Sequence, residues 1–133
     1  MEIKNAQALT GPFGRWPSFH DAEVVSVLLD RRGDEGPTLT AEILVFGTGQ
    51  TDERGSRAKG TEVLATLRFS SVELHDLVEF NRQNVLFSLE LSELEPKGGG
   101  RRYRVDMNPS YGCGASFECR AVEVVSVDPP DEP

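Results

Sequence analysis

The sequence predicts a mainly β protein, an antiparallel sheet arranged as a sandwich or a partly open barrel of about six to seven strands, with at most one short helix. Three observations support this fold class. Apolar residues recur at every second position, turns rich in glycine and proline separate the apolar segments, and most connections are as short as those of antiparallel hairpins. A chain of 133 residues suffices for one core. We therefore predict a single domain over residues 1–133.

The first half of the chain contains three predicted strands. Residues 22–30 carry apolar side chains on two partly covered faces, and Gly33, Gly36 and Pro37 mark the turn that ends this strand. Residues 38–46 and 62–69 are the second and third strands. Residues 47–61 have no apolar periodicity and the composition of a solvated loop, so we expect this segment to be mobile.

The second half begins with an ambiguous segment. Residues 70–84 fit a helix capped by Ser70 or Ser71 as well as a strand, and we favour a short strand that runs into a turn at residues 80–84. Residues 84–95 form the strongest predicted strand, with Val85, Phe87 and Leu89 directed inward. A further strand covers residues 101–108.

The last apolar segment, residues 115–127, changes the phase of its alternation, which predicts a bulge or bend. The tail that follows is rich in proline, which lacks the amide donor that a sheet requires. We expect residues 1–14 and 128–133 to be loosely ordered.

Charge and composition limit the partners. The chain holds 14 Lys and Arg against 22 Asp and Glu, a net charge of −8, and such a surface repels the phosphates of nucleic acids. No apolar run is long enough for a signal peptide or a membrane span. We therefore expect a cytoplasmic protein that binds neither nucleic acid nor membrane.

Cys113 and Cys119 would be too far apart in a strand to form a disulfide, so we interpret both as thiols.

Two His-Asp dipeptides are the candidates for chemistry. His20 and Asp21 precede the first predicted strand, and His75 and Asp76 lie in the ambiguous segment, so the fold could bring four metal ligands or an acid–base pair together. In the alternative interpretation, nearby aromatic residues plug one end of the core while His20 and Asp21 hydrogen-bond to the backbone. The sequence contains no nucleophile elbow and no phosphate loop, and we predict neither an enzyme nor a cofactor.

The chain resembles the immunity protein 50 family of bacterial polymorphic toxin systems in four segments taken in order: W-P-S-F-H-D-A-E-V, L-R-F, F-N-R-Q-N-V-L and F-E-C-R-A-V-E-V-V-S-V-D-P. The resemblance extends over about residues 16–129. It implies a small, non-catalytic cytoplasmic protein that binds and neutralises a cognate toxin.

Acidic side chains are the candidate binding residues. Charge complementarity would steer an acidic inhibitor to a basic toxin, such as a nuclease. The side chains singled out on this basis are Asp30, Asp34, Glu35, Glu90, Glu93 and Glu95. In the alternative interpretation these charges only keep the protein soluble. We expect a monomer or a weak homodimer paired through edge strands.

A second functional hypothesis stays open beside the immunity function. It is a small metal-binding protein or enzyme that uses His20, Asp21 and His75.

Overall fold

A computed structural model describes residues 1–47, 61–96 and 98–130. Within these ranges the chain forms eight strands and one short helix: α1 (Gln7–Phe13), β1 (Glu23–Asp30), β2 (Thr38–Phe46), β3 (Glu62–Ser70), β4 (Glu73–Val78), β5 (Val85–Glu93), β6 (Tyr103–Tyr111), β7 (Gly114–Cys119) and β8 (Ala121–Asp128). Nearly all of the loop predicted at residues 47–61, and the end of the predicted tail, lie outside the described residues. No helix in these ranges is long and apolar enough to cross a membrane.

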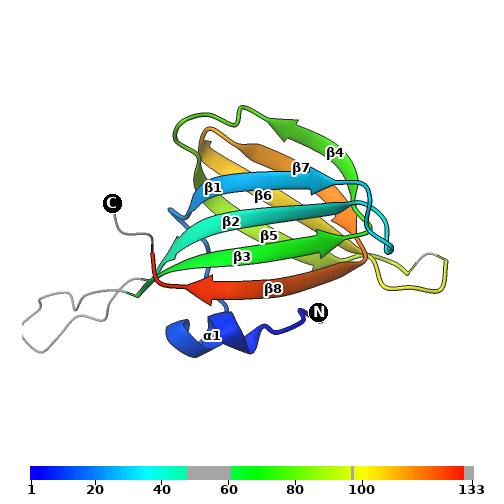
Figure 1. Cartoon of the computed structure of the whole chain (residues 1–133), viewed down its shortest axis with the longest axis horizontal. Coiled ribbons are helices and arrows are strands. Elements are labelled where there is room, and N and C mark those ends of the chain that lie inside the picture. Colours follow the sequence, from blue (N-terminus) through cyan, green and yellow to red (C-terminus); the bar gives the residue numbers. More distant parts are fainter. Residues whose placement is uncertain (48–60, 97, 131–133) are drawn as a thin grey trace, which may run out of the picture.

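The strands form one antiparallel sheet that does not close, in the order β4-β7-β6-β5-β1-β2-β3-β8. The sheet folds over so that β1, β2, β3 and β8 lie in front of β4, β5, β6 and β7 (Figure 1). The two halves meet where Glu23 of β1 pairs with Val85 of β5. They meet again between β7 and β8, where the N–H of Arg120 donates to the carbonyl of Ser70 at 2.9 Å. The predicted class is therefore confirmed, but the sheet is single and continuous rather than a sandwich of two.

The predicted number of strands, six to seven, is too low because the last apolar segment contains two strands. β7 pairs with β4 and β6 in the back layer, whereas β8 pairs with β3 in the front layer, and the chain turns between them at Arg120. The predicted bulge is confirmed within β8. Thr66 lies opposite Ser126 and Leu67 lies opposite Val124, which leaves Val125 as the extra residue. The favoured strand in the ambiguous segment is also confirmed, as β4.

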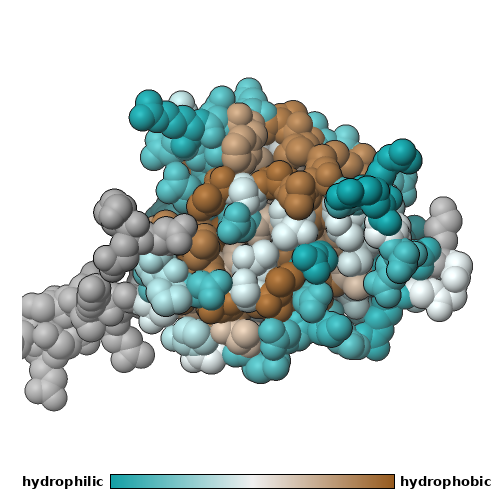
Figure 2. Space-filling model, in the orientation of Figure 1, coloured by the Kyte–Doolittle hydropathy of each residue, from teal (hydrophilic) through white to brown (hydrophobic). Residues whose placement is uncertain are grey.

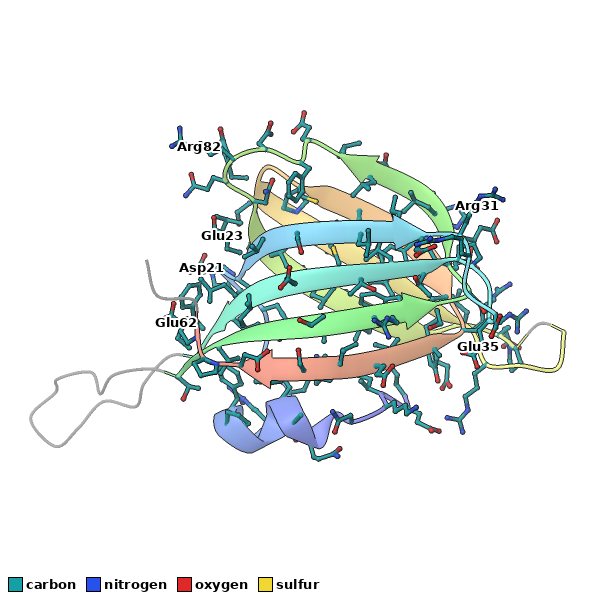
Figure 3. All side chains as sticks on the ribbon, viewed as in Figure 1. Asp21, Glu23, Arg31, Glu35, Glu62 and Arg82 are labelled. Atoms are coloured by element: carbon teal, nitrogen blue, oxygen red, sulfur yellow. The ribbon has the colours of Figure 1, made fainter. Side chains whose placement is uncertain are left out.

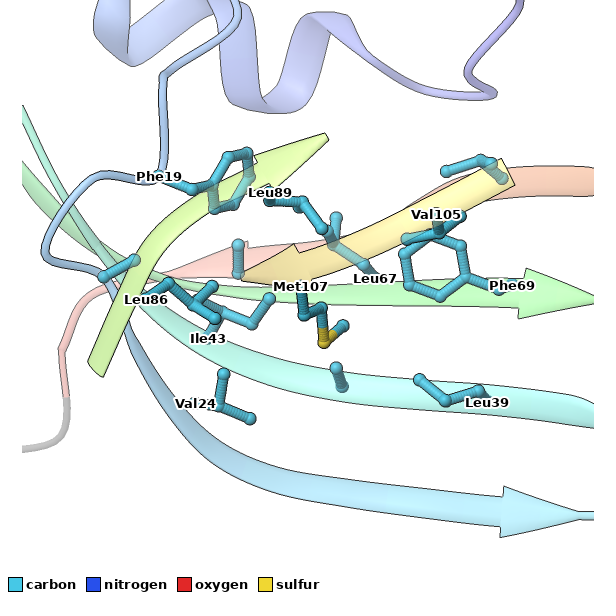
Figure 4. Packing of buried hydrophobic residues seen from close by; sticks show 14 of the residues in the cluster. Phe19, Val24, Leu39, Ile43, Leu67, Phe69, Leu86, Leu89, Val105 and Met107 are labelled. Carbon is cyan, nitrogen blue, oxygen red and sulfur yellow. The ribbon is translucent and has the colours of Figure 1, made fainter. Parts of the chain in front are cut away.

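The core fills the space between the two layers (Figure 4). In β2 the buried and less buried residues alternate, and its buried Leu39 lies opposite the buried Phe69 of β3, so both strands direct one face to the same core. The rings of Phe69 and Phe117 meet edge to face, 5.0 Å between centroids, and so connect the front layer to the back layer. Full burial of each such side chain stabilises the fold by roughly 1.5–3 kcal/mol.

The two edges of the sheet differ. The N-terminal segment covers the β8 edge, because Lys4 donates to the carbonyl of Val122 and accepts from the N–H of Val124, both at 2.9 Å. Helix α1 follows along this edge, with Leu9 fully buried and Gly14 ending the helix in the left-handed conformation. The position of this helix was not predicted from the sequence. Among the described residues, β4 has a strand partner, β7, on one side only.

Candidate functional site

Three segments that lie apart in the sequence meet at one end of the sheet. We call this surface the loop end; it consists of residues 19–24, 79–87 and 109–112, at the left of Figure 1. The N–H of Asp21 donates to the carbonyl of Leu86 at 2.9 Å, and the N–H of Leu86 donates to the carbonyl of Ala22 at 2.8 Å. These bonds attach the segment before β1 to the start of β5.

The buried side chain of Asn84 holds the loop end together. Its Oδ1 accepts from the N–H of Asn81 at 2.7 Å and from the N–H of Cys113 at 3.1 Å. Its Nδ2 donates to the carbonyl of Asn81 at 2.8 Å and to that of Val24 at 3.4 Å. Asn84 is only 3% exposed, and its bonds connect the β4–β5 loop, the β6–β7 turn and β1. This amide therefore has a structural role at the loop end.

The backbone at the loop end adopts unusual conformations. Phe19, Asp21 and Glu79 have φ angles of 63°, 65° and 56°, in the left-handed region that bulky residues rarely occupy. The Phe19 ring is fully buried and lies 5.6 Å from the ring of Trp16, so the predicted aromatic plug is confirmed. Strained conformations of this kind persist only where the surrounding structure enforces them, and they concentrate at binding and catalytic sites.

The side chain of Phe87 points outward, which corrects the prediction that it faces the core. In the pairing of β5 with β6, Leu86 lies opposite Pro109 and Ser88 lies opposite Asn108, so Phe87 is the extra residue of a bulge and is 60% exposed. His20 supports the bulge, because its Nδ1 lies 3.0 Å from the carbonyl oxygen of Phe87 and its ring meets the Phe87 ring edge to face. The structural interpretation of His20 is thereby confirmed.

An open cleft of about 490 Å³ lies beside this bulge, between the β4–β5 loop and the β6–β7 turn. Glu79, Asn81, Ser110 and Tyr111 line it with polar groups, and Tyr111 is 61% exposed. Tyr111 lies opposite Val85 in the sheet, two residues from the Phe87 bulge. The cleft is therefore part of the loop end.

The two His-Asp dipeptides do not form a common site. His75 is the extra residue in the pairing of β4 with β7, and its Nε2 lies 2.8 Å from Oε2 of Glu118. That hydrogen bond lowers the pKa of the Glu118 carboxyl, and the nearby charge of Arg102 adds to the effect. Across the described ranges, no three His, Cys, Asp or Glu side chains gather as metal ligands. The hypothesis that His20, Asp21, His75 and Asp76 form one metal site is therefore wrong for the residues that the structure describes.

The six predicted acidic binding residues come from two hairpins. Asp30 ends β1, and the guanidinium of Arg32 binds its carboxylate with N–O distances of 2.8 and 3.0 Å. These bonds lower the pKa of Asp30 to about 2. Asp34 and Glu35 follow in the β1–β2 turn, and Glu90 on β5 accepts from Asn108 at 3.3 Å. Glu93 and Glu95 lie exposed at the end of β5 and just beyond it.

Both hairpins lie at the end of the molecule opposite the loop end, to the right in Figure 1. Arg31 and Glu35 both lie at this end, where Figure 2 shows mainly hydrophilic side chains, whereas Asp21, Glu23, Glu62 and Arg82 lie at the other end (Figure 3). Basic side chains thus share the surface with the predicted acidic residues.

The comparison with protein families is decisive for the classification. The model of immunity protein 50 matches residues 5–129, nearly the whole chain. The chain belongs to the immunity protein 50 family. No match was found among curated proteins or among solved structures. Membership of this immunity protein family indicates an immunity function, and such families are in general not enzymatic.

In this immunity protein 50 chain, two of the four segments that carry the resemblance are in contact with each other at the loop end. The F-H-D-A-E segment and the F-N-R-Q-N segment build the loop end together. Glu79, Phe87 and Tyr111 could not be identified from the sequence as surface groups of one site. A bulge reverses the direction of Phe87, and a cleft between two loops leaves no pattern in the sequence of either loop.

Proposed function

We propose that this protein binds a cognate protein toxin and neutralises it without catalysing a reaction. The observation that carries the proposal is the match of the immunity protein 50 model to residues 5–129. The local chemistry supports a binding role, because the side chains most suited to catalysis hold the fold. His20 bonds to the backbone of Phe87, and His75 bonds to Glu118.

Charge supports the mechanism of encounter. With a net charge of −8, the protein attracts a basic toxin, such as a nuclease, from a distance and so accelerates association. The field of the whole chain acts in this way even where individual carboxylates, such as Asp30, have a local cationic partner. We place this encounter in the cytoplasm, where thiols such as Cys113 and Cys119 stay reduced.

We propose a monomer as the binding form. The β4 edge offers a place for a second copy to pair, but the bulge at His75 and the carboxylates of Glu73 and Asp76 disfavour pairing of β4 with itself. Sedimentation at micromolar concentrations tests this point, with a dimer as the contradicting result.

Coexpression with the toxin encoded beside this gene tests the function. Cells that express the toxin domain alone should stop growing, and cells that also express this protein should grow. The purified pair should form a complex whose association rate falls steeply as salt is added. Equal killing with and without this protein would overturn the proposal.

The role of the predicted acidic residues is tested in the same complex. Replacement of Glu90, Glu93 and Glu95 together by Gln should slow association several-fold at low salt and leave the dissociation rate unchanged, if these charges act only through steering. An unchanged association rate would show that they serve solubility.

A further inference from the structure

The loop end holds the features of a prepared binding surface. The aromatic side chains of Phe80, Phe87 and Tyr111 are 50%, 60% and 61% exposed. Beneath them the backbone is fixed by Asn84 and by the two hydrogen bonds between the segment before β1 and the start of β5. Exposed aromatic side chains on a rigid backbone are typical of the residues that dominate protein–protein binding energy, because little order is lost when they are covered.

The charge of the loop end is negative. Its three segments contain the carboxylates of Asp21, Glu23 and Glu79 and one guanidinium, that of Arg82. Within the described residues, Glu79 has no cation within ion-pair distance, and Asp21 has only the imidazole of His20, at 3.7 Å. A partner that covers this surface must therefore supply positive charge.

The polar groups of the cleft are mainly acceptors. Nδ2 of Asn81 donates to the carbonyl of Glu79 at 2.7 Å, which leaves Oδ1 of Asn81 as an acceptor. The carboxylate of Glu79 only accepts hydrogen bonds, and the exposed ring of Tyr111 offers an aromatic face. A guanidinium group matches the Asn81 oxygen, the Glu79 carboxylate and the Tyr111 ring, since it is planar, carries five donors and stacks on aromatic rings.

We propose that the cleft between the β4–β5 loop and the β6–β7 turn receives an arginine side chain of the toxin. Glu79 and Asn81 accept its N–H groups, Tyr111 stacks on its plane, and Phe87 contacts the apolar surface around it. This inference rests on the proposed function for the identity of the partner, but the chemistry of the cleft can be tested without the toxin.

The first test uses N-acetyl-arginine methylamide as the probe and the uncharged isostere N-acetyl-citrulline methylamide as the control. In a titration followed by ¹⁵N–¹H NMR, the arginine compound should shift the amide signals of Asn81, Tyr111 and Gly112 with saturation in the millimolar range. The citrulline compound should shift them several-fold less, and the Glu79→Gln variant should lose the difference. Equal shifts with both compounds, or no shift at these amides, would overturn the proposal.

The second test uses the toxin domain. Glu79→Gln and Tyr111→Ala should each weaken the complex about 10-fold or more, mainly through faster dissociation. Glu73→Gln makes the same change of charge at the far end of β4 and should weaken the complex with the toxin less than about 3-fold. Equal effects of Glu79→Gln and Glu73→Gln would refute the arginine site while leaving the immunity function intact. If the unchanged protein does not bind the toxin, the proposed function fails and the titration alone decides the chemistry of the cleft.

Discussion

Replacement of Asn84 by alanine should destabilise the protein more than any other polar substitution at the loop end. The change removes the acceptor of the buried N–H of Cys113, 3.1 Å away, and that of the N–H of Asn81, 2.7 Å away. A buried donor left without a partner costs about 1–3 kcal/mol, and a donor that water can reach costs about 1 kcal/mol or less. Together with the lost bonds from Nδ2, the expected loss is about 3 kcal/mol.

A loss of this size lowers the midpoint of thermal unfolding by about 12 °C, because 1 kcal/mol corresponds to about 4 °C in a chain of this length. The measurement is thermal and urea unfolding of the variant beside Gln83→Ala, which changes an exposed neighbour in the same loop. Gln83→Ala should shift the midpoint by about 2 °C or less. A loss of less than about 1 kcal/mol for Asn84→Ala would show that the amide does not hold the loop end together.

Three further outcomes are expected. Gly112→Ala should destabilise the protein more than Gly99→Ala in urea unfolding. Both glycines have φ of 80°, but a Cβ at Gly112 would clash with the carbonyl oxygen of Gln83, whereas a Cβ at Gly99 would meet nothing within 4 Å. Equal losses would contradict the close approach at Gly112. Burial raises the pKa of the Cys119 thiol to about 12, so Cys119 should resist thiol reagents at pH 8 in the native protein and react in urea. If Cys119 reacts as fast in the native protein as in urea, the thiol is not buried. Hydrogen bonds from Arg32 lower the pKa of Asp30 from 3.8 to about 2, so the stabilisation from this pair is complete above pH 3.8 and fades as the pH falls through 2. In the Arg32→Ala variant, the pKa of Asp30 measured by NMR titration should rise toward 3.8. An unchanged pKa would refute the pair.

Alternation of apolar residues predicted most of the sheet because each strand presents one face to the core. Leu39 and Ile43 follow this rule along β2, as does Phe69 on β3, and all three are fully buried. The rule fails at bulges, where one extra residue reverses the direction of its side chain. Val125 could be predicted, because the phase of the apolar residues changes visibly there. Phe87 could not, because Leu86 and Leu89 around the bulge are apolar as well.

Helix α1 was missed for a different reason. It has only seven residues and contains both Gly11 and Pro12, so its own propensity is weak. The contacts with β8, among them the bond from Nδ2 of Asn5 to the carbonyl of Val124 at 2.9 Å, stabilise it instead. Such contacts join residues more than a hundred positions apart and leave no local pattern.

The distance in sequence between contacting residues also limits what could be predicted of the candidate site. The F-H-D-A-E and F-N-R-Q-N segments are recognisable as sequence, and the structural use of their amide and imidazole groups follows from their chemistry. Their meeting at the loop end depends on the pairing of Glu23 with Val85. It also depends on the backbone hydrogen bonds that join Asp21 and Ala22 to Leu86. The cleft lies between the β4–β5 loop and the β6–β7 turn, which the side chain of Asn84 connects.

The place of β8 in the sheet has a consequence for the order of events during synthesis. β3 can form its hairpin with β2 early, but its second edge stays uncovered until residues 121–128 leave the ribosome, and Lys4 has no strand to bond before then. The front layer is therefore completed late, by contacts of high sequence separation, which fold slowly and leave a strand edge exposed to aggregation meanwhile. The chain can therefore reach its complete fold only some time after its first strands have been translated.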